Sequence, residues 1–481
     1  MIKAAAERRR ARSAGAGRAE PGQARSGGAG QAERERARST GAGQAEPGQA
    51  RSTGAGQAER TRARSAGAGK AERPRAVRLF RALLYGLIFA SSGAQLAIVP
   101  ILPAYAHRLG LSGLAQGALL SATGLATLAF CLPTGALSDR VGARRLTLWA
   151  GALMTAALCT QAVASSFPIL FASRLVFGLG FGMIWTAGIS WLADVAPGGS
   201  SLGGSVASAG AGGAVGPALA GAGVQYFGLT VPFLAAAVVF ALITAALGLL
   251  KVPAPAPAPA TPVTASLRAA VGDSRTIWAA AAIVTAGVTT GVSALLVPQR
   301  LHATGASPGQ IGLAFSVAGV LFVAASTLTA AAGGRAVRTP VAFAGMLALA
   351  LAVSPAALTL APWAVVTMLC TTTAARSVLW TVSYPLAATG AQRCGAGLGV
   401  VMGMLNGVWA ATALLSPLLA GLAAEHVSLR AVFATTEAAC MVMLAATVVL
   451  ARRTRHSDQS VPGGDHSLEP ALRPAGRGPG E

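Results

Sequence analysis

Three charged side chains lie inside long apolar stretches of the sequence, where charge is rare. They are Arg174, Arg376 and Glu437. An arginine at the centre of a membrane helix costs about 2.5–3.5 kcal/mol on insertion scales, so such a residue is expected to face a cavity or a polar partner. Arg376, close to the middle of its stretch, is a candidate for facing a bound solute or a gate. The alternative is packing between helices, or extension of the side chain to the membrane surface.

A second group of candidates consists of aromatic and amide side chains that lie within the apolar stretches. Aromatic surfaces with few polar groups suit an amphipathic or aromatic organic molecule, including a cation held by ring faces. Each of these residues could instead only pack between helices. The group consists of Gln95, Trp185, Trp380, Tyr384, Asn406 and Trp409.

The composition shows which elements must position these residues. Of the 481 residues, 53% are hydrophobic and 11% are charged, and the mean hydropathy is +0.58. Soluble domains usually carry about 25% charged residues. So few charges cannot cover a globule of this size, which excludes a soluble enzyme and indicates that lipid surrounds most of the chain.

Apolar stretches of membrane-spanning length alternate with short polar breaks. They predict an all-α polytopic membrane protein with twelve transmembrane helices, six on each side of the break at residues 251–275. The predicted spans are 79–103, 114–136, 146–166, 168–192, 203–225, 231–250, 276–298, 309–332, 341–360, 363–387, 397–421 and 429–450.

Basic residues in the breaks predict the orientation. With the N-terminus inside, the cytoplasmic breaks carry 12 basic residues and the outer ones carry three. The positive-inside rule therefore places both termini in the cytoplasm, and we expect a multi-pass protein of the cell (plasma or inner) membrane. Residues 251–275 contain an alternating Pro-Ala run and are expected to form a semi-rigid cytoplasmic linker.

The two ends differ from the rest of the chain. Residues 11–75 are five 13-residue repeats without Leu, Ile, Val or aromatic residues. They cannot bury apolar surface, so a disordered basic tail is expected over 1–78, and a second disordered tail over 452–481. The net charge of +22 raises the possibility of nucleic-acid binding, but Gly and Pro dilute the basic residues of the first tail, and we expect no nucleic-acid partner.

The halves 79–250 and 276–451 resemble each other. Residues 216–221 (GPALAG) recur as 416–421 (SPLLAG), and residues 110–112 (GLS) recur as 305–307 (GAS). A duplicated six-helix unit predicts two pseudo-symmetric bundles with a pathway between them near the membrane midplane.

The most specific motif is the break between spans 2 and 3, residues 135–145 (GALSDRVGARR). Gly135 allows a neighbouring helix to approach closely, and Gly142 permits a tight turn. Asp139 is a lone acid beside Arg140, Arg144 and Arg145, where it can cap a helix or pair with an arginine.

This pattern, Gly-x-Leu-x-Asp-Arg-x-Gly-x-Arg-Arg, resembles the signature of the major facilitator superfamily. Residues 174–180 (RLVFGLG) resemble that family's Arg-x-x-x-Gly-x-Gly motif. Residues 212–221 (GGAVGPALAG) resemble the motif of its drug/proton antiporter branch at Gly212, Gly216, Pro217 and Gly221, with Ala220 in place of one Gly. The corresponding second-half loop, residues 333–338, lacks the acid. Glycine-rich helices also simply pack closely, which is the alternative for span 5.

The resemblance implies a secondary transporter that exports a small organic or drug-like molecule by alternating access, coupled to protons. It implies a conformational switch made of Gly135, Asp139, Arg140, Gly142, Arg144, Arg145 and Asp194, and coupling roles for Arg174, Arg376 or Glu437. Span 1 offers Gln95 instead of a carboxylate. If protons drive transport, Glu437, or Asp139 with Asp194, must titrate, or the acid belongs to the substrate.

Two rival functions stay open at this stage: an uptake carrier for a small metabolite with the same fold, and a non-transporting membrane receptor or scaffold. The five cysteines form no CxxC pair, and no Gly-x-x-x-x-Gly-Lys loop occurs. We therefore expect neither catalytic residues nor a metal or cofactor, a proton gradient as the energy source, and a monomer in the lipid bilayer.

Overall fold

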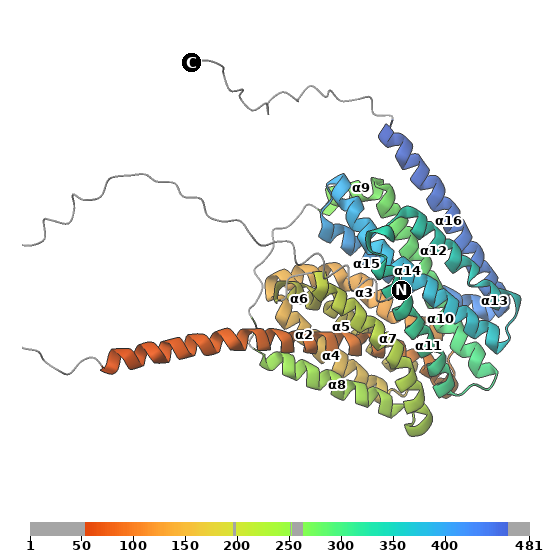
Figure 1. Ribbon diagram of the computed structural model, residues 1–481. Helices are drawn as coiled ribbons and strands as arrows, with labels where there is room; N and C mark the ends of the chain where they lie inside the picture. Colours follow the sequence, from red (N-terminus) through yellow and green to blue (C-terminus); the bar gives the residue numbers. More distant parts are fainter. Residues whose placement is uncertain (1–52, 196–198, 251, 253–262, 460–481) are drawn as a thin grey trace, which may run out of the picture. The chain divides into compact units, whose positions relative to one another are not determined.

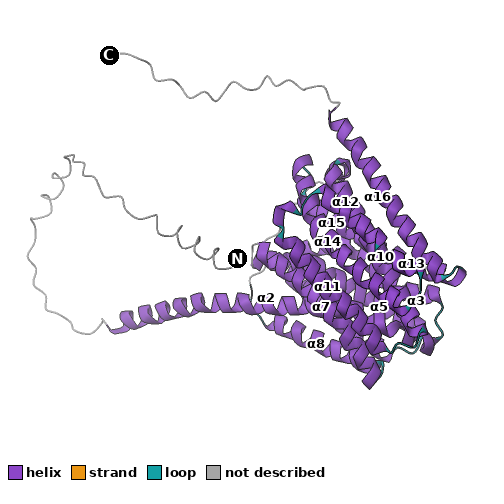
Figure 2. Ribbon diagram, turned by 45° about the vertical axis from the view of Figure 1, so that its right-hand side comes forward, coloured by secondary structure: helices purple, strands orange, loops and turns teal. Residues whose placement is uncertain are grey.

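The computed structural model describes residues 53–195, 199–250, 252 and 263–459. Residues 1–52, 196–198, 251, 253–262 and 460–481 lie outside the described part. The chain divides into two units, residues 1–67 and 68–481. Residues 53–67 form the beginning of helix α2, and the remaining described residues belong to the second unit. The described residues form helices joined by loops and no strand (Figure 2).

Six membrane-length segments come from the first half of the chain, and Figure 1 shows them in the orange to yellow-green part of the colour range. The fourth is an α-helix that continues through a π-helical turn, η1, into a short α-helix. The elements are α2 (Thr53–Leu109), α3 (Gly113–Val141), α4 (Ala143–Val163), α5 (Phe167–Met183), η1 (Ile184–Gly188), α6 (Ile189–Val195), α7 (Gly199–Phe227) and α8 (Thr230–Leu249).

Six further segments come from the second half. The third of these is interrupted after Leu351, where Pro355 opens a new short helix. The elements are α10 (Ser274–Ala303), α11 (Pro308–Ala331), the 3₁₀ turn η2 (Gly333–Arg335), α12 (Thr339–Leu351), α13 (Ser354–Leu358), α14 (Pro362–Cys394), α15 (Leu398–His426) and α16 (Leu429–Gln459).

Within the described residues, eleven helices are long and apolar enough to cross a membrane. The predicted fifth span, α7, has 29 residues but is not among the eleven. Its sequence is rich in Gly, Ser and Ala, which contribute little hydropathy. Small residues instead let neighbouring helices approach closely, so α7 is a membrane-length helix suited to packing against protein.

Three segments that were predicted to be tails or a linker contain helices in the structure. The tail predicted over 1–78 is helical from Thr53, because α2 continues backwards from the first span. The tail predicted from 452 is helical to Gln459. Extending an existing helix adds one hydrogen bond per residue without a new nucleation cost, and Ala, Arg and Glu are good helix formers. The predicted linker contains α9 (Val263–Gly272), which packs on α10, α14 and α15.

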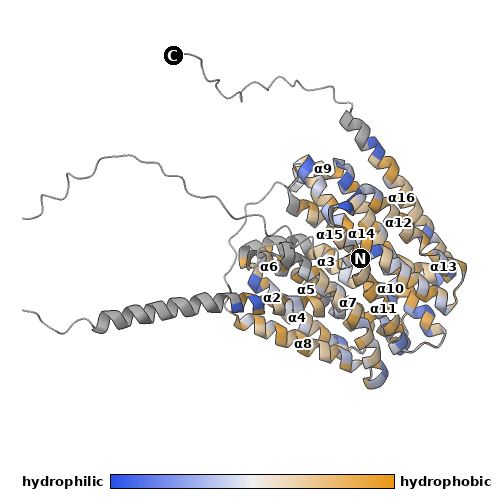
Figure 3. Cartoon of the chain, in the orientation of Figure 1, coloured by the Kyte–Doolittle hydropathy of each residue, from blue (hydrophilic) through white to orange (hydrophobic). Residues whose placement is uncertain are grey.

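Apolar side chains on the outside of the helices support a lipid environment. On α8, Val231, Leu234, Val238, Val239 and Leu242 are all exposed, and Figure 3 shows hydrophobic positions along the length of this helix. Exposed apolar surface of this extent along a helix that is hydrophobic over its whole length is characteristic of a membrane span.

Candidate functional site

Arg174 lies on α5 and is completely buried. Its Nη2 donates to Oε1 of Gln95 on α2 at 3.2 Å, and its guanidinium carbon lies 5.1 Å from the ring centroid of Phe177. The Nε and Nη1 atoms have no hydrogen-bond partner among the described residues. The structure thus joins two predicted candidates, Arg174 and Gln95, in one polar pair inside the first half.

Arg376 forms the matching pair in the second half. Its Nη1 donates to Oγ1 of Thr290 on α10 at 2.9 Å, and its Nη2 donates to Oγ1 of Thr373 at 3.3 Å. Gly110 and Gly305, both at positive φ, are 195 positions apart, and the same offset takes Gln95 to Thr290. The duplicated unit therefore holds an arginine against the first helix of each half.

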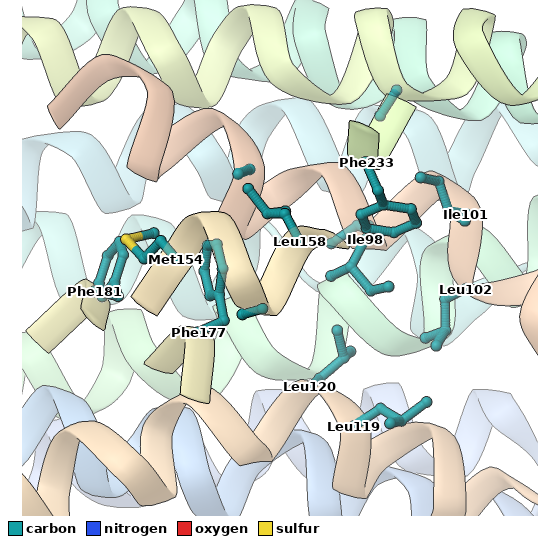
Figure 4. Packing of buried hydrophobic residues seen from close by; sticks show 14 of the residues in the cluster. Ile98, Ile101, Leu102, Leu119, Leu120, Met154, Leu158, Phe177, Phe181 and Phe233 are labelled. Atoms are coloured by element: carbon teal, nitrogen blue, oxygen red, sulfur yellow. The ribbon is translucent and has the colours of Figure 1, made fainter. Parts of the chain in front are cut away.

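An aromatic stripe follows Arg174 along α5 and into η1. Phe177, Phe181 and Trp185 are spaced four residues apart, so they share one helix face. The Phe177 and Phe181 rings are 6.5 Å apart, and the Phe181 and Trp185 rings are 6.3 Å apart. Figure 4 shows Phe177 and Phe181 beside Met154. Trp185 was a predicted candidate and the two phenylalanines were not, although their four-residue spacing from Trp185 indicates the same helix face.

A second stripe follows Arg376 along α14. Trp380 and Tyr384 continue it at the same four-residue spacing, with ring centroids 5.7 Å apart. The Tyr384 hydroxyl donates to Oδ1 of Asn406 on α15 at 2.9 Å. Three predicted candidates are thus brought together here.

Trp409 on α15 connects the two stripes. Its ring lies 6.4 Å from Trp380 and 6.2 Å from Phe181 of the first half. We call the connected set of rings the aromatic bridge. It consists of Phe177, Phe181, Trp185, Trp380, Tyr384 and Trp409.

One end of the bridge is open. Asn406 is exposed, and a Cβ added at Gly403 or Gly407 on the same helix would meet nothing within 4 Å. The rest of α15 is different, because its later residues pack on α3. A Cβ on Gly124 of α3 would lie 2.5 Å from the Leu414 nitrogen, and Ser121 Oγ donates to the Leu414 carbonyl at 2.5 Å.

The same kind of close contact joins α7 and α11. A Cβ on Gly319 of α11 would lie 2.5 Å from the Cα of Ala214 on α7, and the Ala218 amide donates to Oγ of Ser316 at 3.0 Å. The halves therefore meet through two helix pairs, α3 with α15 and α7 with α11. Both helix pairs make these contacts in the part of each helix that is nearer to the loops at residues 110–112 and 304–307.

Two related polar contacts also lie at this closed end. Oε1 of Glu425, at the end of α15, accepts from the Leu114 amide at the start of α3 at 2.8 Å. Oε1 of Gln225, at the end of α7, accepts from Oγ of Ser307 before α11 at 3.1 Å. Glu425 and Gln225 are 200 positions apart, which is the offset between the repeated motifs. Neither residue was a predicted candidate, although the 200-residue offset between Gln225 and Glu425 is visible in the sequence.

Only some residues of the candidate conformational switch lie within the part of the chain that the structure describes. Gly142 caps α4 with φ 94°, and Arg144 Nη2 donates to the carbonyls of Gly248 and Leu250, at 2.7 Å and 3.1 Å, at the end of α8. Arg145 is exposed. The surroundings of Gly135 and the side chains of Asp139, Arg140 and Asp194 lie outside the described part, so the predicted acid–arginine contacts stay predictions.

Glu437 has a separate contact. Its Oε1 accepts from Oγ of Ser354 at 2.7 Å, which ties α16 to the break between α12 and α13. This hydrogen bond fits the packing alternative considered for Glu437.

The antiporter-like motif lies where α7 crosses α2. A Cβ on Gly212 would collide with the Phe89 backbone, and one on Gly216 would collide with Gly93. Pro217 and Gly221 contact α11, at Gly312 and Pro308. Each glycine in this motif therefore permits a close helix crossing, which is the structural alternative for span 5.

Paired six-helix halves joined around an interior aromatic cluster define a class of membrane transport protein. Residues 83–299 match the model of the Major Facilitator Superfamily. The structure resembles a bacterial homolog of the human lysosomal transporter Spinster, solved in an inward-facing and unoccupied conformation. The TM-score is 0.58 with 17% identity, over 81% of this chain and 99% of that one. Residues 83–299 thus match the Major Facilitator Superfamily, a family of transporters rather than enzymes, and the described fold is that of a transporter of this kind.

Curated relatives match over a shorter region. An uncharacterized MFS-type transporter, YfkF of Bacillus subtilis, is 32% identical over 128 residues, covering 25% of this chain and 32% of that protein. The quinolone resistance protein NorA of Staphylococcus aureus is 31% identical over 111 residues, covering 23% of this chain and 28% of that protein. The chain thus matches about a third of the length of these relatives.

Proposed function

We propose that this protein is a secondary active transporter that exports a small aromatic organic molecule by alternating access. The observation that carries the proposal is the aromatic bridge, which joins rings of the two halves at Phe181 and Trp409. A solute bound among these rings would contact both halves at once. Its binding would therefore depend on how the halves are placed relative to each other.

The contacts between the halves support a transporter closed at one end. The α3–α15 and α7–α11 crossings lie toward the loops predicted to be outside, whereas Gly403 and Gly407 face open space nearer the predicted cytoplasmic end of α15. In this assignment the structure is inward-open. The similarity to a transporter solved in an inward-facing conformation agrees with it.

The proposal also includes the direction of transport, its energy source and its location. The resemblance to a quinolone resistance protein favours export of a drug-like compound over uptake of a metabolite. The proposed energy source is the proton gradient, with both termini in the cytoplasm of a cell or inner membrane and a monomer as the working unit. Asp139 with Asp194, Glu437, or an acid on the substrate would carry the proton.

Transport in everted membrane vesicles tests this proposal. With an imposed inward-acidic gradient, vesicles containing the protein should accumulate a fluorescent aromatic dye, and an uncoupler should abolish the accumulation. Trp409→Ala should reduce the initial rate, because it removes the ring that joins the stripes. Trp363 on α14, 67% exposed, provides the matched control Trp363→Ala, which should transport normally.

The outcomes separate the rival functions. Accumulation in right-side-out vesicles but not in everted ones would indicate uptake. No gradient-dependent flux in either orientation, with the protein folded in the membrane, would favour a non-transporting receptor or scaffold.

A further inference from the structure

Arg376 is the charged side chain that adjoins the aromatic bridge on α14. It lies fourteen residues after Pro362, the first residue of α14, which is about 21 Å along the helix at 1.5 Å per residue. Its side chain is partly exposed, whereas Arg174 is completely buried. A positive charge near the middle of a membrane helix therefore borders the same helix face as Trp380 and Tyr384.

The contacts of Arg376 orient its charge without neutralising it. Its two hydrogen bonds go to the hydroxyl oxygens of Thr290 and Thr373. Among the residues that the structure describes, no carboxylate contacts its guanidinium. A planar guanidinium with five donors matches a carboxylate or phosphate group, and a charge at membrane depth without a counter-charge favours an anionic ligand.

We propose that the substrate is an amphipathic organic anion whose charged group pairs with Arg376 while its rings lie along Trp380, Tyr384 and Trp409. This inference rests on the proposed transport function and names its substrate class. Arg376 and Tyr384 are eight residues apart on α14, about 12 Å along the axis. The ligand is therefore a body of two to four fused or linked rings with an acidic group at one end.

This arrangement also decides against the cationic substrates that the ring faces alone would permit. A cation stacked on Trp380 would lie one helical turn from the Arg376 guanidinium, where two like charges repel in a medium of low dielectric constant. The anion gains from both features, because its charge meets the arginine and its rings meet the stripe. The same anion would carry the carboxylate that spans 1 and 4 lack.

Two sources of such an anion exist: a soluble aromatic carboxylate and a lipid with a single anionic phosphate. Equilibrium binding to the purified full-length protein in nanodiscs distinguishes them. The probes are 1-pyrenebutyrate, its uncharged methyl ester, a pyrenebutyl-trimethylammonium cation and a lysophosphatidate. Binding is followed by quenching of tryptophan fluorescence.

Wild-type protein should bind 1-pyrenebutyrate about tenfold more tightly than the methyl ester, as expected for one charge-assisted pair. Arg376→Gln should remove this difference, and Arg376→Lys should restore part of it. Arg430→Gln, at an exposed position, is the control and should behave as wild type. Tight binding of lysophosphatidate with weak binding of the carboxylate would support the anion and assign it to lipid.

Two results would overturn the inference. One is equal affinity of wild-type protein for the anion and its ester, or preference for the cation. The other is an equal loss of anion and ester binding in Arg376→Gln, which would assign Arg376 a packing role. If only the proposed transport function is wrong, the results differ from these two. The anion would still bind through Arg376, but vesicles would show no gradient-driven flux.

Discussion

The crossing of α3 and α15 gives the sharpest test of how the halves close. A methyl group added at Gly124 would lie 2.5 Å from the Leu414 nitrogen and 2.6 Å from the Ala413 carbonyl carbon. Ordinary carbon contacts lie at about 3.5–4.0 Å, so the two helices must separate by about 1 Å. Backbone atoms cannot move aside as a flexible side chain can, and the separation opens the closed end.

Overpacking of this kind typically costs about 1–3 kcal/mol. This free energy destabilises only the state in which α3 and α15 are in contact. Gly124→Ala should therefore raise the population of the opened state relative to the closed state. At 1.4 kcal/mol for each factor of ten, the increase is about 5- to 150-fold. Gly403→Ala on α15 is the matched control, because its methyl group would meet nothing within 4 Å.

A single cysteine at Ser121, which is 3% exposed in this crossing, reports the opening. In a background without the native cysteines, Ser121→Cys is labelled with a membrane-impermeant maleimide added outside intact cells. Gly124→Ala should accelerate labelling strongly, and Gly403→Ala should leave the rate unchanged. Equal rates in the two variants would refute the assignment of this crossing as the outer closure.

Three further predictions follow from the polar contacts and from backbone conformation. Gly142→Ala should lower the unfolding free energy by about 1–3 kcal/mol in an SDS titration, because a side chain is strained at φ 94°. Arg144→Leu should cost about 1.5–3 kcal/mol in the same titration through loss of two charge-assisted bonds to the end of α8, whereas the exposed Arg145→Leu should cost little; equal effects would contradict this. Glu425→Leu and Gln225→Leu remove the two acceptors, so each should widen the distance between spin labels on the paired helices at the closed end, measured by pulsed electron resonance. No change in either variant would show that these contacts do not hold the halves together.

The sequence by itself determined the class of the protein and the number of its membrane-length segments. Hydropathy and run length are local properties, and a bilayer imposes a fixed length on each span. The duplication was equally visible, because residues 216–221 and 416–421 repeat one pattern. Residue chemistry also pointed to Trp185, Trp380, Tyr384 and Trp409, which the structure brings together in the aromatic bridge.

Only the tertiary structure decided which residues meet. Nothing in the sequence near Gly124 states that it faces Leu414, or that Glu425 reaches the start of α3. These contacts depend on the rotation and crossing angle of each helix, which are set by the packing of all its neighbours at once. For the same reason two arginines of equal hydropathy have different surroundings. Arg174 is completely buried against Phe177, whereas Arg376, one turn before Trp380 on α14, stays partly exposed.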